Sequence, residues 1–91
     1  MYQGRHCTYS DYQLLENVSK EFLPILNRDK FDINEVENYL DTLSDFDFEI
    51  SSKIRMHLEK ISIDRGGTIA KITHLIEELK NNVLVDVREH N

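Results

Sequence analysis

The sequence contains few of the residues that interrupt regular structure or cross-link a chain. Its 91 residues include three glycines, one proline and one cysteine. So few turn-forming residues argue against an all-β fold, which needs many tight turns. The single cysteine, Cys7, cannot form an intrachain disulfide, and this is typical of proteins from the reducing cytosol.

Long hydrophobic runs are also missing. No segment approaches the ~18 consecutive apolar residues that predict a transmembrane helix, and the N-terminal residues do not resemble a secretory signal peptide. Apolar residues make up 40% of the chain and charged residues 31%, a balance typical of a folded, helix-rich domain. We therefore expect a soluble cytoplasmic protein that has no membrane partner.

Hydrophobic residues recur at helical spacing in four segments. This pattern predicts an all-α fold, a small four-helix bundle with helices near residues 10–27, 32–43, 46–62 and 68–85. Residues 1–9 lack such a period and are predicted to form a flexible N-terminal arm, so that residues 10–91 make a single helical domain. Pro24 removes one backbone donor, and the first helix should end or kink near Leu23 with a last turn reaching about Asn27.

The predicted helix starts rest on polar residues that can cap free backbone N–H groups. Ser10 with Gln13, and Asp32 with Glu35, have the spacing of a capping box. For the third helix, either Ser44 or Asp45 is expected to be the cap. At the C-terminal end, residues 83–87 (VLVDV) continue the helical period but also favour a strand, so both interpretations remain open, with a continued helix preferred.

The fourth segment carries a heptad-like row of hydrophobic residues. A chain this short builds only a modest core, and we expect three short helices to leave this row partly uncovered. Because two-fold dimers are the commonest closed oligomers, we predict a homodimer, with the first predicted helix as a further contributor. Replacing Ile72 and Ile76 by aspartate should then give monomers or unfolded chain. The predicted dimerisation residues are Ile69, Ile72, Ile76, Leu79 and Val83.

The adjacent glycines Gly66 and Gly67 raise the question of a phosphate-binding loop. Both the lysine that follows the last glycine of a P-loop and the G-x-G-x-x-G fingerprint are absent, and a helix rather than a strand precedes the pair. The simpler interpretation is that Gly66 ends the third helix in a left-handed conformation and Thr68 caps the fourth. Capture of a small anion at this helix start, near Arg65, is kept as an alternative.

Neither a metal site nor a catalytic group is indicated by the remaining polar residues. Structural zinc needs four ligands in close pairs, whereas the single Cys7 and the scattered histidines offer no such set. His6 and Cys7 are neighbours within the predicted arm, where nothing holds a nucleophile and a base in register. We expect a protein that is not an enzyme and has no cofactor or metal.

The net charge of −6 is concentrated in one segment of the chain. Residues 29–49 carry a net charge of −7, whereas the remainder carries +1. Such a surface repels nucleic acid and attracts a basic protein by long-range steering, so we predict a basic protein partner and no direct nucleic-acid binding. The predicted partner-binding residues are Glu35, Glu37, Asp41, Asp45, Phe46, Asp47, Phe48 and Glu49.

Two phenylalanines interrupt this acidic segment. One of Phe46 and Phe48 should be buried by the helical period, and the other can be an exposed anchor for a partner. The alternative is that both pack into the core or into a dimer interface. Reversing the charge of Glu37, Asp41 and Asp45 together with Asp47 is expected to leave the fold intact, because these residues lie off the hydrophobic faces.

The pattern of Asn34, Val36, Leu40 and Leu43, followed by IRMHLEKI at residues 54–61, resembles the small enterobacterial biofilm-development regulators of the two-component-system connector type. The resemblance covers about half of the chain. It implies a homodimeric helical regulator without enzymatic activity, and it carries over no functional residue.

Three functional hypotheses follow. The first is a small regulatory or inhibitory protein that binds a protein partner through its acidic face. The second is an immunity-type protein or nucleic-acid mimic that blocks a basic nucleic-acid enzyme. The third is a small-ligand or anion-binding domain at the Gly66–Gly67 helix start.

Overall fold

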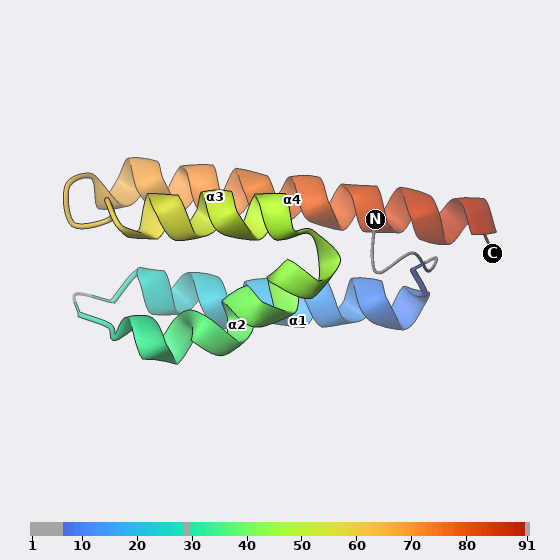
Figure 1. Cartoon of the computed structure of the whole chain (residues 1–91), viewed down its shortest axis with the longest axis horizontal. Coiled ribbons are helices and arrows are strands. Elements are labelled where there is room, and N and C mark those ends of the chain that lie inside the picture. Colours follow the sequence, from blue (N-terminus) through green and yellow to red (C-terminus); the bar gives the residue numbers. More distant parts are fainter. Residues whose placement is uncertain (1–6, 29, 91) are drawn as a thin grey trace.

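Four antiparallel helices make up the bundle. The computed structural model describes residues 7–28 and 30–90, which contain α1 (Tyr9–Leu26), α2 (Ile33–Phe46), α3 (Phe48–Leu58) and α4 (Arg65–His90). Each helix runs antiparallel to the one before it, and α4 returns beside α1 to close the bundle (Figure 1). The described residues contain no strand. The predicted all-α four-helix arrangement is therefore confirmed.

The longest helix, α4, sets the length of the molecule. Its 26 residues span about 39 Å at 1.5 Å per residue, close to the longest dimension of 42 Å. Because α2 and α3 are shorter, the corner between them lies near the middle of α4 (Figure 1). Residues 83–87 are helical and not a strand, so the preferred interpretation of VLVDV is confirmed.

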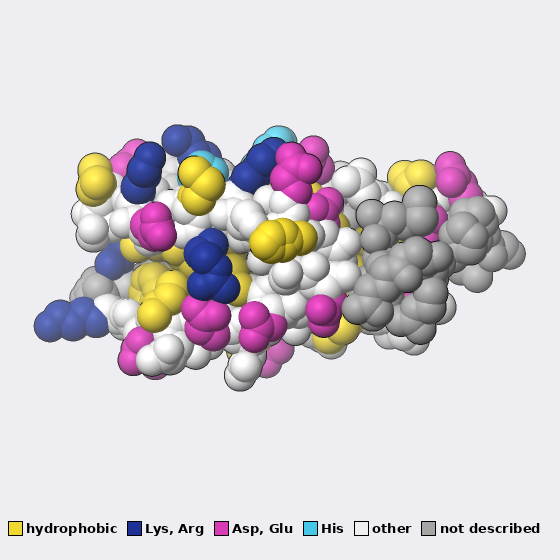
Figure 2. Space-filling view, viewed as in Figure 1, with side chains coloured by type: hydrophobic (Ala, Val, Ile, Leu, Met, Phe, Trp, Pro, Cys, Tyr) yellow, Lys and Arg dark blue, Asp and Glu magenta, His cyan; other side chains and the backbone are white. Residues whose placement is uncertain are grey.

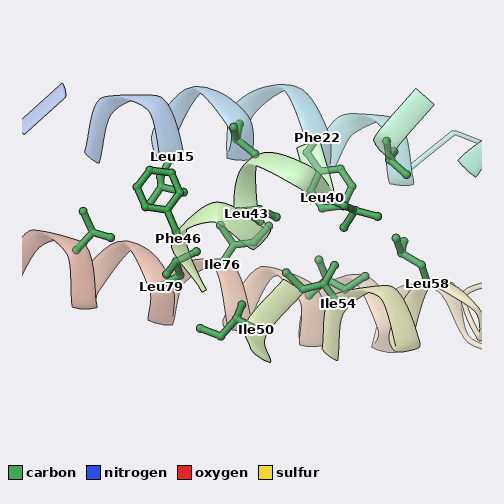
Figure 3. Packing of buried hydrophobic residues seen from close by; sticks show 14 of the residues in the cluster. Leu15, Phe22, Leu40, Leu43, Phe46, Ile50, Ile54, Leu58, Ile76 and Leu79 are labelled. Carbon is green, nitrogen blue, oxygen red and sulfur yellow. The ribbon is translucent and has the colours of Figure 1, made fainter. Parts of the chain in front are cut away.

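Side chains from all four helices share one hydrophobic core. Figure 3 shows them pointing into the space between the helices. A polar contact fastens α3 to α2 inside this core, because the buried Ser51 hydroxyl donates to the Leu40 carbonyl oxygen at 3.0 Å. The fully buried core residues are Leu15, Phe22, Leu26, Val36, Leu40, Leu43, Ile54, Ile72 and Ile76.

The residues predicted to form a dimer lie inside this core instead of on a free surface. Ile72 and Ile76 are fully buried, Leu79 and Val83 are almost so, and Ile69 is partly buried against the same cluster. The expectation that three short helices would leave the row uncovered was wrong, because α4 packs against both α1 and α3 within one chain. Dimerisation through this row would require the bundle to open.

The first helix begins one residue earlier than predicted, with a different cap. Thr8, not Ser10, is the N-cap, and it forms a capping box with Asp11. The Asp11 N–H donates to the Thr8 hydroxyl at 3.3 Å, and the Thr8 N–H donates to the Asp11 carboxylate at 2.7 Å. Pro24 lies in the last turn, and the helix ends at Leu26, whose fully buried side chain holds that turn in place.

The predicted N-terminal arm falls partly outside the described residues, which exclude residues 1–6. Of the rest, Cys7 is buried and Tyr9 is the first residue of α1. The Cys7 N–H donates to the carboxylate of Asp86 on α4, a contact between residues 79 positions apart. The packed chain therefore begins no later than Cys7, three residues before the predicted domain boundary.

The double glycine lies within α4 and does not separate two helices. α3 ends at Leu58 and α4 begins at Arg65, so both glycines occupy the first turn of α4, and neither has a positive φ. Asp64, and not Thr68 as predicted, caps the start of α4. The Asp64 carboxylate accepts a hydrogen bond from the Gly67 N–H at 3.1 Å, and the Asp64 carbonyl oxygen accepts one from the Thr68 N–H at 3.0 Å. A carboxylate already occupies the position at which an anion would bind.

Candidate functional site

A single residue joins α2 to α3 and forms a sharp corner. Asp47 has an extended backbone, with φ −156° and ψ 101°, and it is both the C-cap of α2 and the N-cap of α3. Its N–H donates to the Leu43 carbonyl oxygen at 2.9 Å, and its carboxylate accepts from the Ile50 N–H at 3.1 Å. The cap of α3 is thus Asp47, not Ser44 or Asp45 as predicted.

The corner buries one of its two phenylalanines and exposes the other. Phe46 is the last residue of α2, and Phe48 is the first residue of α3. Phe46 is 4% exposed and belongs to the core, whereas Phe48 is 66% exposed. The prediction that one ring is buried is confirmed, and the exposed ring is Phe48.

Ion pairs neutralise much of the acidic segment. Glu35 pairs with Arg28 at 3.0 Å across the α1–α2 turn, and Glu49 pairs with Lys53 at 3.4 Å within α3. Glu37 accepts two hydrogen bonds from the guanidinium of Arg55, at 2.8 and 3.1 Å, so α2 is clamped to α3. These three carboxylates contribute less to a field around the molecule than the sequence alone suggests.

The clamp between Glu37 and Arg55 also affects titration. Hydrogen bonds from Arg55 hold the pKa of Glu37 below its ordinary value, and the same bonds raise the pKa of Arg55. A lowered carboxyl pKa in the folded state stabilises the fold at neutral pH, and this contribution is lost as the pH falls through the lowered value. Charge reversal at Glu37 would remove this pair, so we expect it to weaken the contact between α2 and α3, although the sequence alone predicted an intact fold.

Two acids and one aromatic ring remain available for a partner. Asp41 and Asp45 are exposed on α2 and form no ion pair within residues 7–28 and 30–90. Figure 2 shows acidic side chains along the edge of the molecule that α2 forms, and basic side chains mainly over α3 and its C-terminal end. We call Asp41, Asp45, Phe48 and the adjacent Glu49 the acidic corner.

Asp47 itself has a structural role, and its loss should weaken the corner. Replacing Asp47 by alanine removes the cap of α3 and is expected to lower the free energy of unfolding by about 1 kcal/mol. For a domain of this size the thermal midpoint should fall by roughly 4–8 °C. Thermal melts followed by circular dichroism measure both. Asp45→Ala, an exposed carboxylate two residues away, is the control and should stay within about 0.5 kcal/mol of wild type.

A hollow of about 220 Å³ lies beside the corner, on the side of the C-terminal half of α4. Cys7 lines this hollow. Burial raises the pKa of the Cys7 thiol, and the negative charges of Asp86 and Asp11 raise it further. A raised pKa leaves little of the reactive thiolate at neutral pH. The hollow is lined by Cys7, Phe46, Asp47, Leu79, Asn82, Val83 and Asp86.

Cys7 should accordingly react slowly with alkylating reagents. At about pH 8 we expect iodoacetamide to modify the folded chain at least about tenfold more slowly than free cysteine. Mass spectrometry of timed samples measures the rate. In concentrated urea the rate should rise to that of free cysteine, and equal rates in the folded and unfolded chain would contradict the burial of Cys7.

The other polar groups of the described residues do not form a metal-binding cluster. Within the described part of the chain, no group of three or more histidine, cysteine, aspartate or glutamate side chains could hold a metal ion. His57 and His74 face one open hollow between α3 and α4, together with Lys71. None of the helices, as far as they are described, is long and apolar enough to cross a membrane.

Comparison with known proteins adds no assignment: the chain matches no protein-family model, no curated protein and no solved structure.

Of the eight predicted partner-binding residues, Asp41, Asp45, Phe48 and Glu49 are exposed, and the other four have different roles. Phe46 is in the core, Asp47 is a cap, and Glu35 and Glu37 are held by arginines. The Glu49–Lys53 pair was readable from its i,i+4 spacing. The Glu37–Arg55 pair was not, because it joins two helices.

Proposed function

We propose that this chain is a small non-enzymatic regulatory or inhibitory protein that binds a basic protein partner in the cytoplasm through the acidic corner. The observation that carries the proposal is the 66% exposure of Phe48, in the same segment as Asp41 and Asp45, two exposed carboxylates that form no ion pair with any of the described residues. When a partner covers a large apolar side chain that is exposed to water, the free energy of the complex is lowered. Carboxylates around it select a partner with basic side chains.

The two parts of the corner contribute differently to binding. Exposed charges act mainly on the association rate, because they attract an oppositely charged surface from a distance. An aromatic side chain that is desolvated at the centre of an interface acts mainly on the dissociation rate. Asp41 and Asp45 therefore steer the partner, and Phe48 anchors it.

The remaining hypotheses receive less support. Capture of an anion at the Gly66–Gly67 helix start is disfavoured by the Asp64 carboxylate, which already accepts from the Gly67 N–H. A nucleic-acid mimic requires a long row of free acids, whereas Glu35, Glu37 and Glu49 are paired with basic side chains. A nucleic-acid enzyme as the captured partner would nevertheless be a special case of the proposed function.

Affinity capture from nuclease-treated lysate tests the proposal. The bait is the wild-type chain, and the variant is Asp41→Lys with Asp45→Lys, which changes the net charge from −6 to −2. Wild type should retain a basic protein at low salt and release it as salt screens the charges. The double variant should lose that protein.

A matched control carries the same change of net charge at another place. Glu21→Lys with Glu78→Lys alters exposed acids of α1 and α4, outside the acidic corner. It should capture the same protein as wild type. Equal loss in both double variants would show that only net charge matters, and direct binding of nucleic acid by the wild-type chain would overturn the proposal.

A further inference from the structure

A hollow between α3 and α4 is large enough for a small molecule. Its volume is about 360 Å³, within the ~300–1,000 Å³ that is usual for small-molecule sites in proteins. A second hollow of about 180 Å³ lies along α3, and His57 lines both. We call the larger one the basic hollow. It is lined by His57, Ala70, Lys71, His74 and Leu75.

The sequence of α4 places the lining residues on one face of that helix. Residues 70, 71, 74 and 75 differ by one, four and five positions, so they lie side by side over two turns. Leu75 packs against the core, whereas Lys71 and His74 are exposed. The basic hollow therefore combines an apolar lining with polar groups that reach water, as ligand sites usually do.

The charge of the lining is opposite in sign to that of the whole chain. The sequence has 17 acidic residues against 11 lysines and arginines, yet none of the described aspartates and glutamates lines either hollow. Lys71, His57 and His74 form no ion pair with any of the described residues. In the second hollow, Lys53 is shared with Glu49 at 3.4 Å. Lys71 is therefore the main source of positive charge.

These groups match an anion that has an apolar part. The ammonium group of Lys71 attracts and hydrogen-bonds an anionic oxygen, and each imidazole ring carries at least one N–H donor. Ala70 and Leu75 can cover an apolar chain. A metal ion is disfavoured, because the positive charge of Lys71 lies beside the two imidazoles. We propose that the basic hollow binds a small organic anion, such as a carboxylate on an alkyl chain. This site does not depend on the proposed function.

Nuclear magnetic resonance titrations with three probes test the chemistry of the ligand. Octanoate carries both the anion and the chain, acetate only the anion, and 1-octanol only the chain. Octanoate should bind at least about tenfold more tightly than either of the others. Its saturable shifts should centre on the amides of His57, Ala70, Lys71 and His74. Equal binding of acetate or of 1-octanol would overturn the proposal, as would octanoate shifts that lie elsewhere.

A double variant tests the residues. Lys71→Gln with His74→Gln removes the ammonium group and one imidazole, and it should weaken octanoate binding at least about tenfold. Both residues are exposed, so the variant should melt as wild type does. Lys20→Gln on α1 is the control, because it also changes the net charge from −6 to −7 and Lys20 is exposed outside both hollows. Equal weakening in the two variants would show an effect of net charge alone and would overturn the site.

An anionic lipid headgroup offers similar chemistry from a membrane surface. Vesicles of phosphatidylglycerol and phosphatidylcholine test this source by co-sedimentation. The wild-type chain should remain in the supernatant, because a membrane of negative charge repels a chain of net charge −6. Co-sedimentation that Lys71→Gln with His74→Gln abolishes, without octanoate binding in solution, would assign the hollow to membranes and overturn the proposal.

The same double variant keeps this inference separate from the proposed function. Lys71 and His74 lie outside the acidic corner, so Lys71→Gln with His74→Gln should capture the basic protein as wild type does. Likewise, Asp41→Lys with Asp45→Lys should bind octanoate at least as tightly as wild type does. Octanoate binding that requires Asp41 and Asp45, and not Lys71 and His74, would place the ligand elsewhere and overturn the inference.

Discussion

Replacement of Ile76 by aspartate is expected to unfold the chain. Ile76 is fully buried, and Figure 3 shows it in the interior that α2 and α4 share with the other helices. A carboxylate there has neither water nor a cationic partner, and an uncompensated buried charge costs about 3–5 kcal/mol. Small domains have total stabilities of roughly 5–15 kcal/mol, and a 91-residue chain belongs near the lower end. Far-ultraviolet circular dichroism should show loss of helix at room temperature.

Two controls separate burial from other effects of the substitution. Ile76→Val keeps the side chain apolar and should cost about 0.5–1.5 kcal/mol. Val85→Asp places the same charge on the same helix at a position that is 52% exposed, and it should remain within about 0.5 kcal/mol of wild type. A folded, monomeric Ile76→Asp chain would instead support the original expectation that this row forms a dimer interface.

Replacement of Phe48 by alanine is expected to lower the affinity for the basic partner by about 30-fold. Aromatic anchors at interface centres contribute about 2 kcal/mol or more, and each 1.4 kcal/mol corresponds to about a tenfold change in Kd. Most of the loss should appear in the dissociation rate. Stability should hardly change, because the ring is exposed in the free chain. Surface plasmon resonance with the captured partner measures both rate constants.

Tyr9 offers a matched control for this substitution. It is another exposed aromatic residue, 56% exposed at the start of α1, where its ring stacks on Tyr12. Tyr9→Ala should leave the partner affinity unchanged. If Phe48→Ala and Tyr9→Ala had equal effects, the ring of Phe48 would not be a specific anchor.

The number and order of the helices were predictable because they depend on local information. Hydrophobic spacing and polar caps are properties of neighbouring residues, and Asp32 was correctly identified as an N-cap. Its predicted capping box with Glu35 does not form, because Asp32 accepts from the Asn34 N–H and Glu35 pairs with Arg28. Helix ends were less predictable where several capping residues compete. Thr8 and Ser10 both suit the start of α1, and Ser44, Asp45 and Asp47 all suit the start of α3. The choice among them depends on tertiary packing, because Cys7 and Phe46, the residues just before the two observed caps, lie in the core.

The function of individual surface residues was harder to predict, because it depends on contacts between helices. Asp41 and Glu37 both look like free acids in the sequence, yet Glu37 is held by Arg55, 18 positions away, and Asp41 is not. In the same way, the hydrophobic row on α4 has the pattern of a dimer interface. That pattern does not reveal whether the partner is another chain or another helix of the same chain.

The most direct test of the acidic corner is the association rate constant measured against ionic strength. With the captured basic protein, wild type should associate fastest at low salt and slow steeply as the Debye length shrinks to about 8 Å. The Asp41→Lys, Asp45→Lys variant should associate at least about tenfold more slowly at low salt and show a flatter salt dependence. Glu21→Lys with Glu78→Lys should behave nearly as wild type does. If the two double variants have the same rate and the same salt dependence, the acidic corner is not the binding surface.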